Sequence, residues 1–209
     1  MQILLISATV QEIQPFLDSE PKIDTLITGV GVPSTLYHLQ KRMQQIDYDL
    51  IIQAGIAGTF NDTIPLGQTV IVKQDSFGDL GVEEKEKYTA IFDTGLMAKS
   101  EFPFENGWLV NTNEIFRTSS LPAAKAITVN KISDSILLKQ QHVKQFNADI
   151  ESMEGAALHY ICLQENIPFL QIRSISNHVG ERDRSKWKMK EAIGNLNTDL
   201  SKLINELTN

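Results

Sequence analysis

The segment LIIQAGIAGT, residues 50–59, joins a short apolar run to two closely spaced glycines. Its first four residues have the composition of a buried strand, and AGIAGT, residues 54–59, should end that strand. Gly55 and Gly58 carry no Cβ, so the backbone there can come close to a ligand or to a neighbouring strand. Tight packing explains the two glycines equally well, so the segment by itself predicts a buried strand without deciding its role.

Similar apolar runs recur along the chain and alternate with amphipathic stretches. The runs lie at residues 3–6, 25–27, 69–72, 126–129 and 169–172. Residues 33–46 and 135–146 are amphipathic, and from Ser185 onward apolar residues repeat at steps of three and four, as in a helix with one buried face. This stripe consists of Ile193, Leu196, Leu200, Leu203, Ile204 and Leu207. The alternation predicts an α/β fold, with helices packed on a sheet.

Length, composition and charge restrict the class of protein. We expect residues 1–209 to form one domain, because this length suits one medium-sized core better than two. Hydrophobic residues make up 42% and charged residues 22%, which excludes intrinsic disorder, collagen and coiled coils. A net charge of −7 disfavours nucleic acid and anionic membrane surfaces as partners. The first residues include no basic region or long apolar stretch, so we expect no signal peptide and no membrane span. A small-molecule ligand is therefore expected.

The sequence contains no pattern typical of a metal or cofactor site. Cys162 is the only cysteine, which excludes a disulfide framework and fits a reducing cytoplasm. The histidines lack HExxH or paired spacing, so we expect no metal and expect surface or half-buried side chains. They are His38, His142, His159 and His178. Gly29 and Gly31 lack the third glycine of a dinucleotide motif, since Ser34 stands there, and a tight strand-to-helix turn is favoured. GxSxG is also absent, which excludes covalent acyl chemistry.

Residues 73–107 interrupt the alternation of strands and helices. They include several glycines, a proline and the charged run EEKEK at residues 83–87. We interpret them as a long excursion, not as a second domain. Long loops of this kind serve as lids or subunit contacts, and a plain solvated insertion is the alternative.

Three polar residues lie where strands meet helices, the usual place for ligands in α/β folds. Glu12 follows the first strand, Glu154 precedes a helix, and Asn177 follows a late strand. Each has a simpler explanation, because either glutamate could favour a helix dipole and the asparagine could hold a turn before Gly180. Their occurrence together favours a ligand site.

Two N-terminal segments resemble the purine nucleoside phosphorylase and nucleosidase superfamily. SATVQEI, residues 7–13, resembles the opening segment that carries the catalytic glutamate, which falls here on Glu12. AGIAGT resembles the glycine-rich loop beneath the ribose, which implies that Ala54 and Gly55 lie under the sugar. The resemblance runs from the first strand to the final helix. It implies a central mixed, twisted and partly barrel-like sheet flanked by helices, and a homodimer or higher homo-oligomer.

The segment ESMEGAA, residues 151–157, resembles the superfamily segment that holds the ribose, which implies this role for Met153 and Glu154. Further along, residues 173–187 resemble the purine-side segment, where methylthioadenosine/S-adenosylhomocysteine nucleosidases carry an aspartate and this chain has Asn177. The resemblance implies that Asn177 contacts the leaving purine. A nucleoside is then the expected small-molecule substrate, with no cofactor.

Asn177, the following GERDRSKW and FGDLGVE at residues 77–83 resemble the futalosine hydrolases within this superfamily. Those enzymes release hypoxanthine and dehypoxanthinyl futalosine in menaquinone biosynthesis. An amide can donate to O6 of a purine and accept from protonated N7, so Asn177 suits hypoxanthine better than adenine. Arg182 and Arg184 are candidates for the benzoate carboxylate of futalosine, and solvated surface arginines are the alternative.

The resemblance also implies roles for neighbouring residues. The backbone of Ile115 and Phe116, in NTNEIF, resembles the loop that contacts the base, and Arg173 is expected to orient the two glutamates. Superfamily phosphorylases bind phosphate with arginines from the early and glycine-loop segments, yet residues 1–41 and 53–60 contain none. Water is therefore the expected nucleophile, with Glu12 as general base.

Three alternatives stay open at this stage. A methylthioadenosine/S-adenosylhomocysteine or aminofutalosine nucleosidase would cleave 6-amino nucleosides. A purine nucleoside phosphorylase would require phosphate. A non-catalytic nucleoside-binding module would bind without turnover, and the presence of both Glu12 and Glu154 argues against it.

Overall fold

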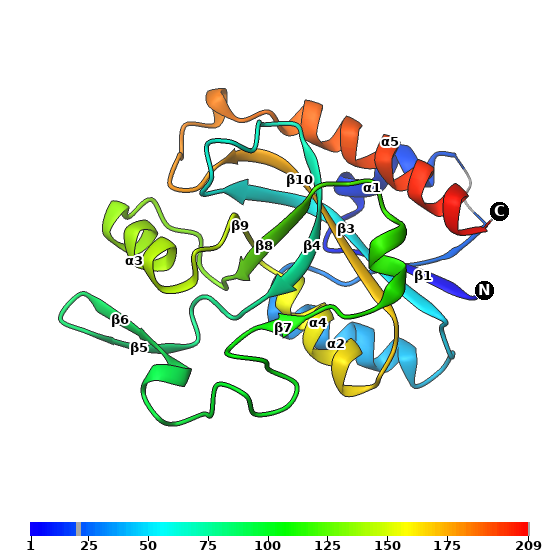
Figure 1. The fold of residues 1–209 in the computed structure, drawn as a ribbon. Helices are drawn as coiled ribbons and strands as arrows, with labels where there is room; N and C mark the ends of the chain where they lie inside the picture. Colours follow the sequence, from blue (N-terminus) through cyan, green and yellow to red (C-terminus); the bar gives the residue numbers. More distant parts are fainter. Residues whose placement is uncertain (20–21, 209) are drawn as a thin grey trace.

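Two long parallel strands lie at the centre of the molecule, whose computed structural model describes residues 1–19 and 22–208. They are β3 (Leu50–Thr59) and β10 (Phe169–His178), paired along almost their whole length (Figure 1). Both are buried on their two faces for most of their residues, which explains their continuous apolar runs. The prediction that AGIAGT ends the strand is wrong, because pairing with β10 continues to Thr59 and stabilises the extended backbone.

Five strands close into a barrel-like ring. β10 pairs with β4 (Thr69–Asp75) antiparallel, and β4 pairs with β8 (Ala123–Thr128) parallel. β8 pairs with β9 (Ile150–Ser152) parallel, and β9 returns antiparallel to the last residues of β3. The short β7 (Leu109–Val110) pairs with the end of β4. The mixed, partly barrel-like sheet expected from the resemblance is confirmed.

The edge of β3 opposite β10 is shared by two strands. β1 (Ile3–Ser7) pairs with the first half of β3, up to Gln53, and carries β2 (Asp24–Ile27) on its far side. β9 pairs with Gly58 and Thr59 only. Within the described residues, no strand covers residues 54–57 on this edge. Groups outside the sheet can therefore approach the middle of β3.

Helices cover the sheet on two sides because the side chains of a strand alternate in direction. Ile3 and Leu5 of β1 pack with α1 (Val10–Leu17) and α5 (Met189–Thr208). Leu4 and Ile6 pack on the opposite side with side chains of α2 and α4. These helices span Val32–Met43 and Gly155–Gln164. The predicted stripe of the last helix is confirmed, although that helix begins at Met189, after the 3-10 turn η3 (Arg184–Lys186).

The excursion over residues 73–107 contains a β-hairpin, which the sequence did not predict. β5 (Gly81–Glu84) pairs with β6 (Lys87–Ala90), and a 3-10 turn, η1 (Ile91–Asp93), follows. Lys85 and Glu86 have φ values of 50° and 65°, so the EEKEK run forms a turn with two left-handed residues. The hairpin lies beside α3 (Ile136–Phe146), and Figure 1 shows it at the periphery. Among the described residues, no helix is long and apolar enough to cross a membrane.

Candidate active site

A cavity of about 300 Å³ opens at the carboxyl ends of β1, β3 and β10. Four of the side chains predicted for the site line it, namely Glu12, Met153, Glu154 and Asn177. They come from segments separated by up to 165 residues, and the closed sheet brings them together because parallel strands end on one side. The excursion at residues 73–107 contributes no residue to the cavity lining, so the structure gives no support to its role as a lid.

Glu12 is buried near the start of α1. One carboxylate oxygen, Oε2, accepts hydrogen bonds from the backbone N–H of Thr9 at 3.0 Å, from the Thr9 hydroxyl at 3.0 Å and from the Ser7 hydroxyl at 3.2 Å. A carboxylate three residues after the helix N-cap reaches back to this N–H in many helices. Only 8% of Glu12 is exposed, so the alternative of a solvated first-turn carboxylate is wrong.

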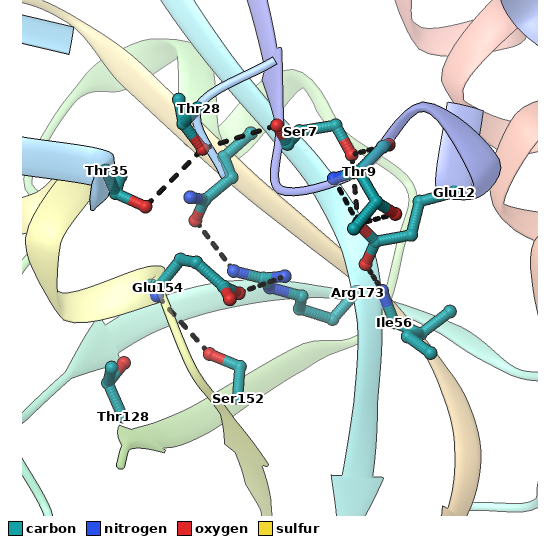
Figure 2. A network of polar contacts seen from close by, with 12 residues as sticks. Ser7, Thr9, Glu12, Thr28, Thr35, Ile56, Thr128, Ser152, Glu154 and Arg173 are labelled. Atoms are coloured by element: carbon teal, nitrogen blue, oxygen red, sulfur yellow. Dashed lines mark hydrogen bonds and ion pairs between the residues drawn. The ribbon is translucent and has the colours of Figure 1, made fainter. Parts of the chain in front are cut away.

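The other oxygen of Glu12, Oε1, reaches the uncovered edge of β3. It accepts the N–H of Ile56 at 3.1 Å, in the part of the edge that neither β1 nor β9 covers. Figure 2 shows this contact beside the three donors to Oε2. Among the described residues Ile56 supplies the one hydrogen bond to Oε1, so this oxygen keeps capacity for a further donor on the cavity side.

Glu154 stands directly before α4 and is 5% exposed. Its Oε1 accepts the N–H of Gly31 at 3.1 Å, and its Oε2 lies 3.5 Å from Nη1 of Arg173. Burial raises the pKa of Glu154, the charge of Arg173 and the Gly31 hydrogen bond offset part of that rise, and the nearby charge of Glu12 adds to it. Gly31 has φ of 90°, a conformation that favours glycine, so GVG forms the predicted turn and also supplies this donor.

Arg173 is absent from the cavity lining and lies between the two glutamates in Figure 2. Its Nη2 donates to Oε1 of Gln53 at 2.8 Å, and the whole side chain is buried. A Cβ on Gly55 would lie 2.3 Å from Nη1 of Arg173 and 2.8 Å from Oε1 of Glu12. Gly55 is therefore required by close packing of the charged groups. Arg173 thus lies beside Glu154, and its role in orienting the two glutamates stays a prediction.

Ala54 does not belong to the cavity. It is fully buried in the hydrophobic cluster beneath α1 and α5, because β3 continues beyond it and alternate residues face opposite sides. Ile56, Ala57 and Gly58, further along the strand, line the cavity instead. Gly55 is likewise absent from the lining, so the glycine-rich segment contributes residues 56–58 to the cavity instead of the predicted Ala54 and Gly55.

Ile115 and Phe116 are also misplaced by the sequence prediction. They lie in the 3-10 turn η2 (Glu114–Thr118) and pack against the hydrophobic cluster of Ile3 and Leu5. Neither lines the cavity, since burying their apolar surface favours contact with this cluster. The loop after β8 supplies Ile132 to the lining instead. The position of this loop after a parallel strand was a signal that could have identified Ile132. The resemblance of NTNEIF to the loop that contacts the base pointed to Ile115 and Phe116 instead.

Asn177 lies opposite Gly58 at a bulge in β10. Its side-chain Nδ2 donates to the carbonyl of His178 at 3.0 Å, and its Oδ1 accepts the hydroxyl of Ser176 at 2.7 Å. An amide has two N–H donors and two acceptor lone pairs, so each end keeps capacity for a further hydrogen bond. These two contacts within the chain set the orientation in which the amide meets a ligand.

A buried acid behind the cavity supports the first turn of α4. Asp75 accepts hydrogen bonds from the N–H of Ser76 at 2.8 Å and from the hydroxyl of Thr128 at 3.0 Å. The Thr128 hydroxyl in turn accepts the N–H of Ala156 at 2.7 Å, two residues after Glu154. Complete burial raises the pKa of Asp75 to about 6, despite the opposing effect of the Thr128 hydrogen bond. Asp75 was not predicted from the sequence as part of the site.

The cavity lining is dominated by negative charge. Glu151 and Glu181 line it together with Glu12 and Glu154, whereas Arg182 is its one basic residue. Arg173 is excluded from the lining and already contacts Glu154 and Gln53. A phosphate dianion near the sugar would therefore meet the carboxylates of Glu12 and Glu154, and the lining offers it a single exposed guanidinium.

The histidines do not gather around the cavity. His142 and His159 are buried, so the expectation of surface or half-buried side chains is wrong for them. Burial lowers the pKa of His159 to about 4, which keeps its ring neutral, and the ring lies 2.9 Å from the carbonyl of Leu109. Across the described residues, no group of three or more His, Cys, Asp or Glu side chains could hold a metal ion.

Comparisons with known proteins agree with this architecture. A futalosine hydrolase of Thermus thermophilus is 27% identical over 218 residues, covering 97% of this chain and 95% of that protein. A 5'-methylthioadenosine/S-adenosylhomocysteine nucleosidase of Listeria monocytogenes is 26% identical, covering 73% of this chain and 67% of that protein. The native structure of a Helicobacter pylori futalosine hydrolase superposes with a TM-score of 0.81 at 14% identity, covering 98% of this chain and 97% of that one.

A family model described as the phosphorylase superfamily matches residues 25–209. The matched region includes β3, the segment before α4 and the end of β10, which supply most of the cavity wall. Glu12 lies outside the matched region, and its place in the cavity comes from the pairing of β1 with β3. From the matched residues, the closed mixed sheet and the glutamates at its strand ends, we conclude that this chain belongs to the phosphorylase superfamily.

Proposed function

We propose that this protein is a nucleosidase that hydrolyses the N-glycosidic bond of futalosine, releasing hypoxanthine and dehypoxanthinyl futalosine. The observation that carries the proposal is the meeting of Glu12, Glu154 and Asn177 around one cavity. An amide at residue 177 suits a 6-oxo purine, because it presents both a donor and an acceptor to the base edge. The similarity to futalosine hydrolases over almost the whole chain supports the same substrate.

Water is the proposed nucleophile. The carboxylates of Glu12 and Glu154 oppose the binding of phosphate near the sugar, and Arg182 alone cannot form the paired guanidinium site that phosphate favours. Oε1 of Glu12 has one acceptor position left after Ile56, so it can hold and deprotonate a water molecule. Hydrolysis is therefore favoured over phosphorolysis.

The proposed reaction passes through an oxocarbenium-like sugar. The bond between the anomeric carbon and purine N9 breaks, and the purine leaves with a proton at N7 that comes from solvent. Asn177 Oδ1 accepts that N–H, and its Nδ2 donates to O6. Water then attacks the anomeric carbon and gives its proton to Glu12. Glu154 accepts from the ribose hydroxyls, while Met153 packs against the sugar.

The main alternative is a nucleosidase for 6-amino substrates. The similarity to a methylthioadenosine/S-adenosylhomocysteine nucleosidase favours it. A 6-amino group donates to its partner, so it pairs well with a carboxylate and would compete with the Nδ2 donor of Asn177. The side chain at residue 177 is thus the observation that favours a 6-oxo base.

A product assay tests these proposals together. Purified protein is given futalosine, aminofutalosine, inosine or methylthioadenosine, with and without phosphate, and the purine and sugar products are separated by chromatography. We expect hypoxanthine from futalosine at a rate that does not depend on phosphate. The Glu12→Gln variant, purified in parallel, controls for contaminating nucleosidases. Sugar 1-phosphate, preferred cleavage of 6-amino substrates or binding without turnover would each contradict the proposal.

We also propose that the protein acts in the cytoplasm, in menaquinone biosynthesis, as a homodimer or larger homo-oligomer. Large apolar side chains are exposed at Val30, Tyr37, Leu96 and Phe102, with exposed fractions of 56–74%. Contact between copies of the chain would remove this apolar surface from water. Light scattering coupled to gel filtration should give at least twice the mass of one chain, and a monomeric mass would contradict the assembly.

A further inference from the structure

The loop between β10 and α5 forms one side of the cavity mouth, in the orange segment of Figure 1. Its first part is held by the N–H of Glu181, which donates to the carbonyl of His178 at 3.1 Å. Its last part is held by the N–H of Lys188, which donates to the carbonyl of Ser176 at 2.8 Å. Both anchors lie on β10 beside Asn177, so the loop is positioned relative to the site.

Glu181 is already paired inside this loop. Its carboxylate accepts hydrogen bonds from the N–H of Asp183 at 2.8 Å and from Nζ of Lys186 at 2.6 Å. The hydrogen bond from Lys186 lowers the pKa of Glu181. The acid next to Arg182 is therefore neutralised by another cation, which leaves Arg182 available for an external partner.

Arg182 lies over an aromatic ring at the cavity mouth. Its guanidinium carbon is 5.6 Å from the ring centroid of Trp187, whose indole N–H donates to the carbonyl of Glu181 at 3.0 Å. Among the side chains that the structure describes, no carboxylate lies within ion-pair distance of Arg182. The ring and the guanidinium together offer an apolar face and a planar pair of donors.

The position of Arg182 determines where an anionic group could bind. At the floor, Glu12 and Glu154 would repel an anion, whereas the mouth is exposed and carries the basic residue. A cavity of about 300 Å³ is at the lower end of the range for ligand pockets. A nucleoside with an aryl extension on its sugar would therefore project through the mouth, past Trp187.

We propose that Arg182, stacked on Trp187, is a specificity site that binds the carboxylate of an aryl extension on the nucleoside substrate. A guanidinium binds a carboxylate through two parallel N–H donors, and the indole supports the aromatic ring. This inference rests on the proposed function in one respect, because futalosine carries such a benzoate group. Under this proposal, Arg182 makes the protein prefer futalosine over nucleosides without an anionic extension.

The test compares futalosine with its benzoate methyl ester, in which an added methyl group removes the negative charge. We expect the wild type to bind the acid about 10- to 100-fold better than the ester, measured as the ratio of KM values. Arg182→Gln should bring this ratio close to one by raising KM for the acid. Arg184→Gln is the matched control, because Arg184 is exposed in the same loop and does not line the cavity.

Three outcomes would overturn the inference: no preference for the acid in the wild type, a preference that survives Arg182→Gln, or an equal loss in Arg184→Gln. Failure of the proposed function has a different signature, because neither compound would then be cleaved. In that case isothermal titration of both compounds against wild type and Arg182→Gln gives the same ratio from dissociation constants. The role of Arg182 is then decided without turnover.

Discussion

The floor and the mouth of the cavity are held by different kinds of structure. At the floor, Glu12, Glu154 and Arg173 are 8%, 5% and 1% exposed, and each is bonded to backbone or to another buried side chain. At the mouth, Arg182 is exposed on a short irregular loop and contacts Trp187 through its ring face. The floor is assembled from several strands and from the starts of α1, α2 and α4, whereas the mouth depends on one loop.

This difference separates two tasks. Buried charges need fixed partners, because an unpaired charge in the interior is costly, so the floor tolerates little change. An exposed loop residue carries no such requirement and can be replaced without disturbing the core. We therefore expect changes at the floor to reduce turnover of every nucleoside, and changes at the mouth to alter the choice among nucleosides.

The largest expected effect is that of Glu12→Gln at the floor. The amide cannot deprotonate water, and its NH₂ group must face either Ile56 N–H or the donors at Thr9 and Ser7. We expect kcat to fall by about 10²- to 10⁴-fold, measured by steady-state hypoxanthine release. Asp18→Asn, at the exposed end of α1, makes the same chemical change as a control. Near-normal turnover in Glu12→Gln would refute the assignment of the base.

Glu154→Gln should follow, with a loss of about 10- to 150-fold in kcat/KM. The change removes the ion pair with Arg173 and weakens the hydrogen bonds that residue 154 accepts from the ribose hydroxyls. Hydrogen bonds to a charged group contribute roughly 1.5–3 kcal/mol. The comparison is sharpened with 2'- and 3'-deoxy substrates. The wild type should process them poorly, and Glu154→Gln should discriminate less against them. Equal rates on the parent and deoxy substrates in the wild type would exclude this role.

Asn177 lies between the floor and the mouth, and the Asn177→Asp substitution should change which purine base the enzyme prefers. An aspartate loses the donor to O6 and gains an acceptor for a 6-amino group, so relative kcat/KM should move from futalosine toward aminofutalosine. Mispairing one buried polar group costs about 1–3 kcal/mol, which corresponds to about 5- to 150-fold in that ratio. If activity falls equally on both substrates, Asn177 acts only through its bonds with Ser176 and His178.

The smallest effect concerns stability beneath the floor. The fold raises the pKa of Asp75 to about 6, so it favours the protonated acid. The stability that this gives is present below the unfolded pKa of about 4 and is lost as pH rises through about 6. Relative to Asp75→Asn, which stays neutral, the wild type should lose about 2 kcal/mol of unfolding free energy between pH 4 and pH 7. Urea denaturation of both proteins at the two pH values measures this, and a constant difference would contradict it.

Local patterns were sufficient to predict strands and helices that bury an apolar surface. The strands at residues 3–6 and 169–172 and the stripe of α5 were predicted because each buries an apolar surface with the period of its own secondary structure. The hairpin at residues 81–90 was missed, because its strands are short and mostly exposed. Polar exposed strands carry little periodic signal.

The candidate site divides in the same way. Glu12, Met153, Glu154 and Asn177 were identified from motifs and line the cavity. The resemblance misplaced Ala54, which belongs to the hydrophobic core, and Ile115 and Phe116, which pack against that core. It did not identify Asp75 as part of the support. Motif similarity finds side chains with distinctive chemistry and places ordinary apolar side chains less well.

The α/β class, the acidic character of the chain and the pair of glutamates at strand ends follow from the amino-acid sequence, because they depend on composition and local periodicity. The folded structure adds that β1 pairs with one part of a β3 edge and β9 with another, which leaves the Ile56 N–H between them for Glu12. It also decided that Arg173 lies behind the cavity and Arg182 at its mouth. Such placements depend on which strands pair across the closed ring, and pairing between distant segments is set by packing of the whole core.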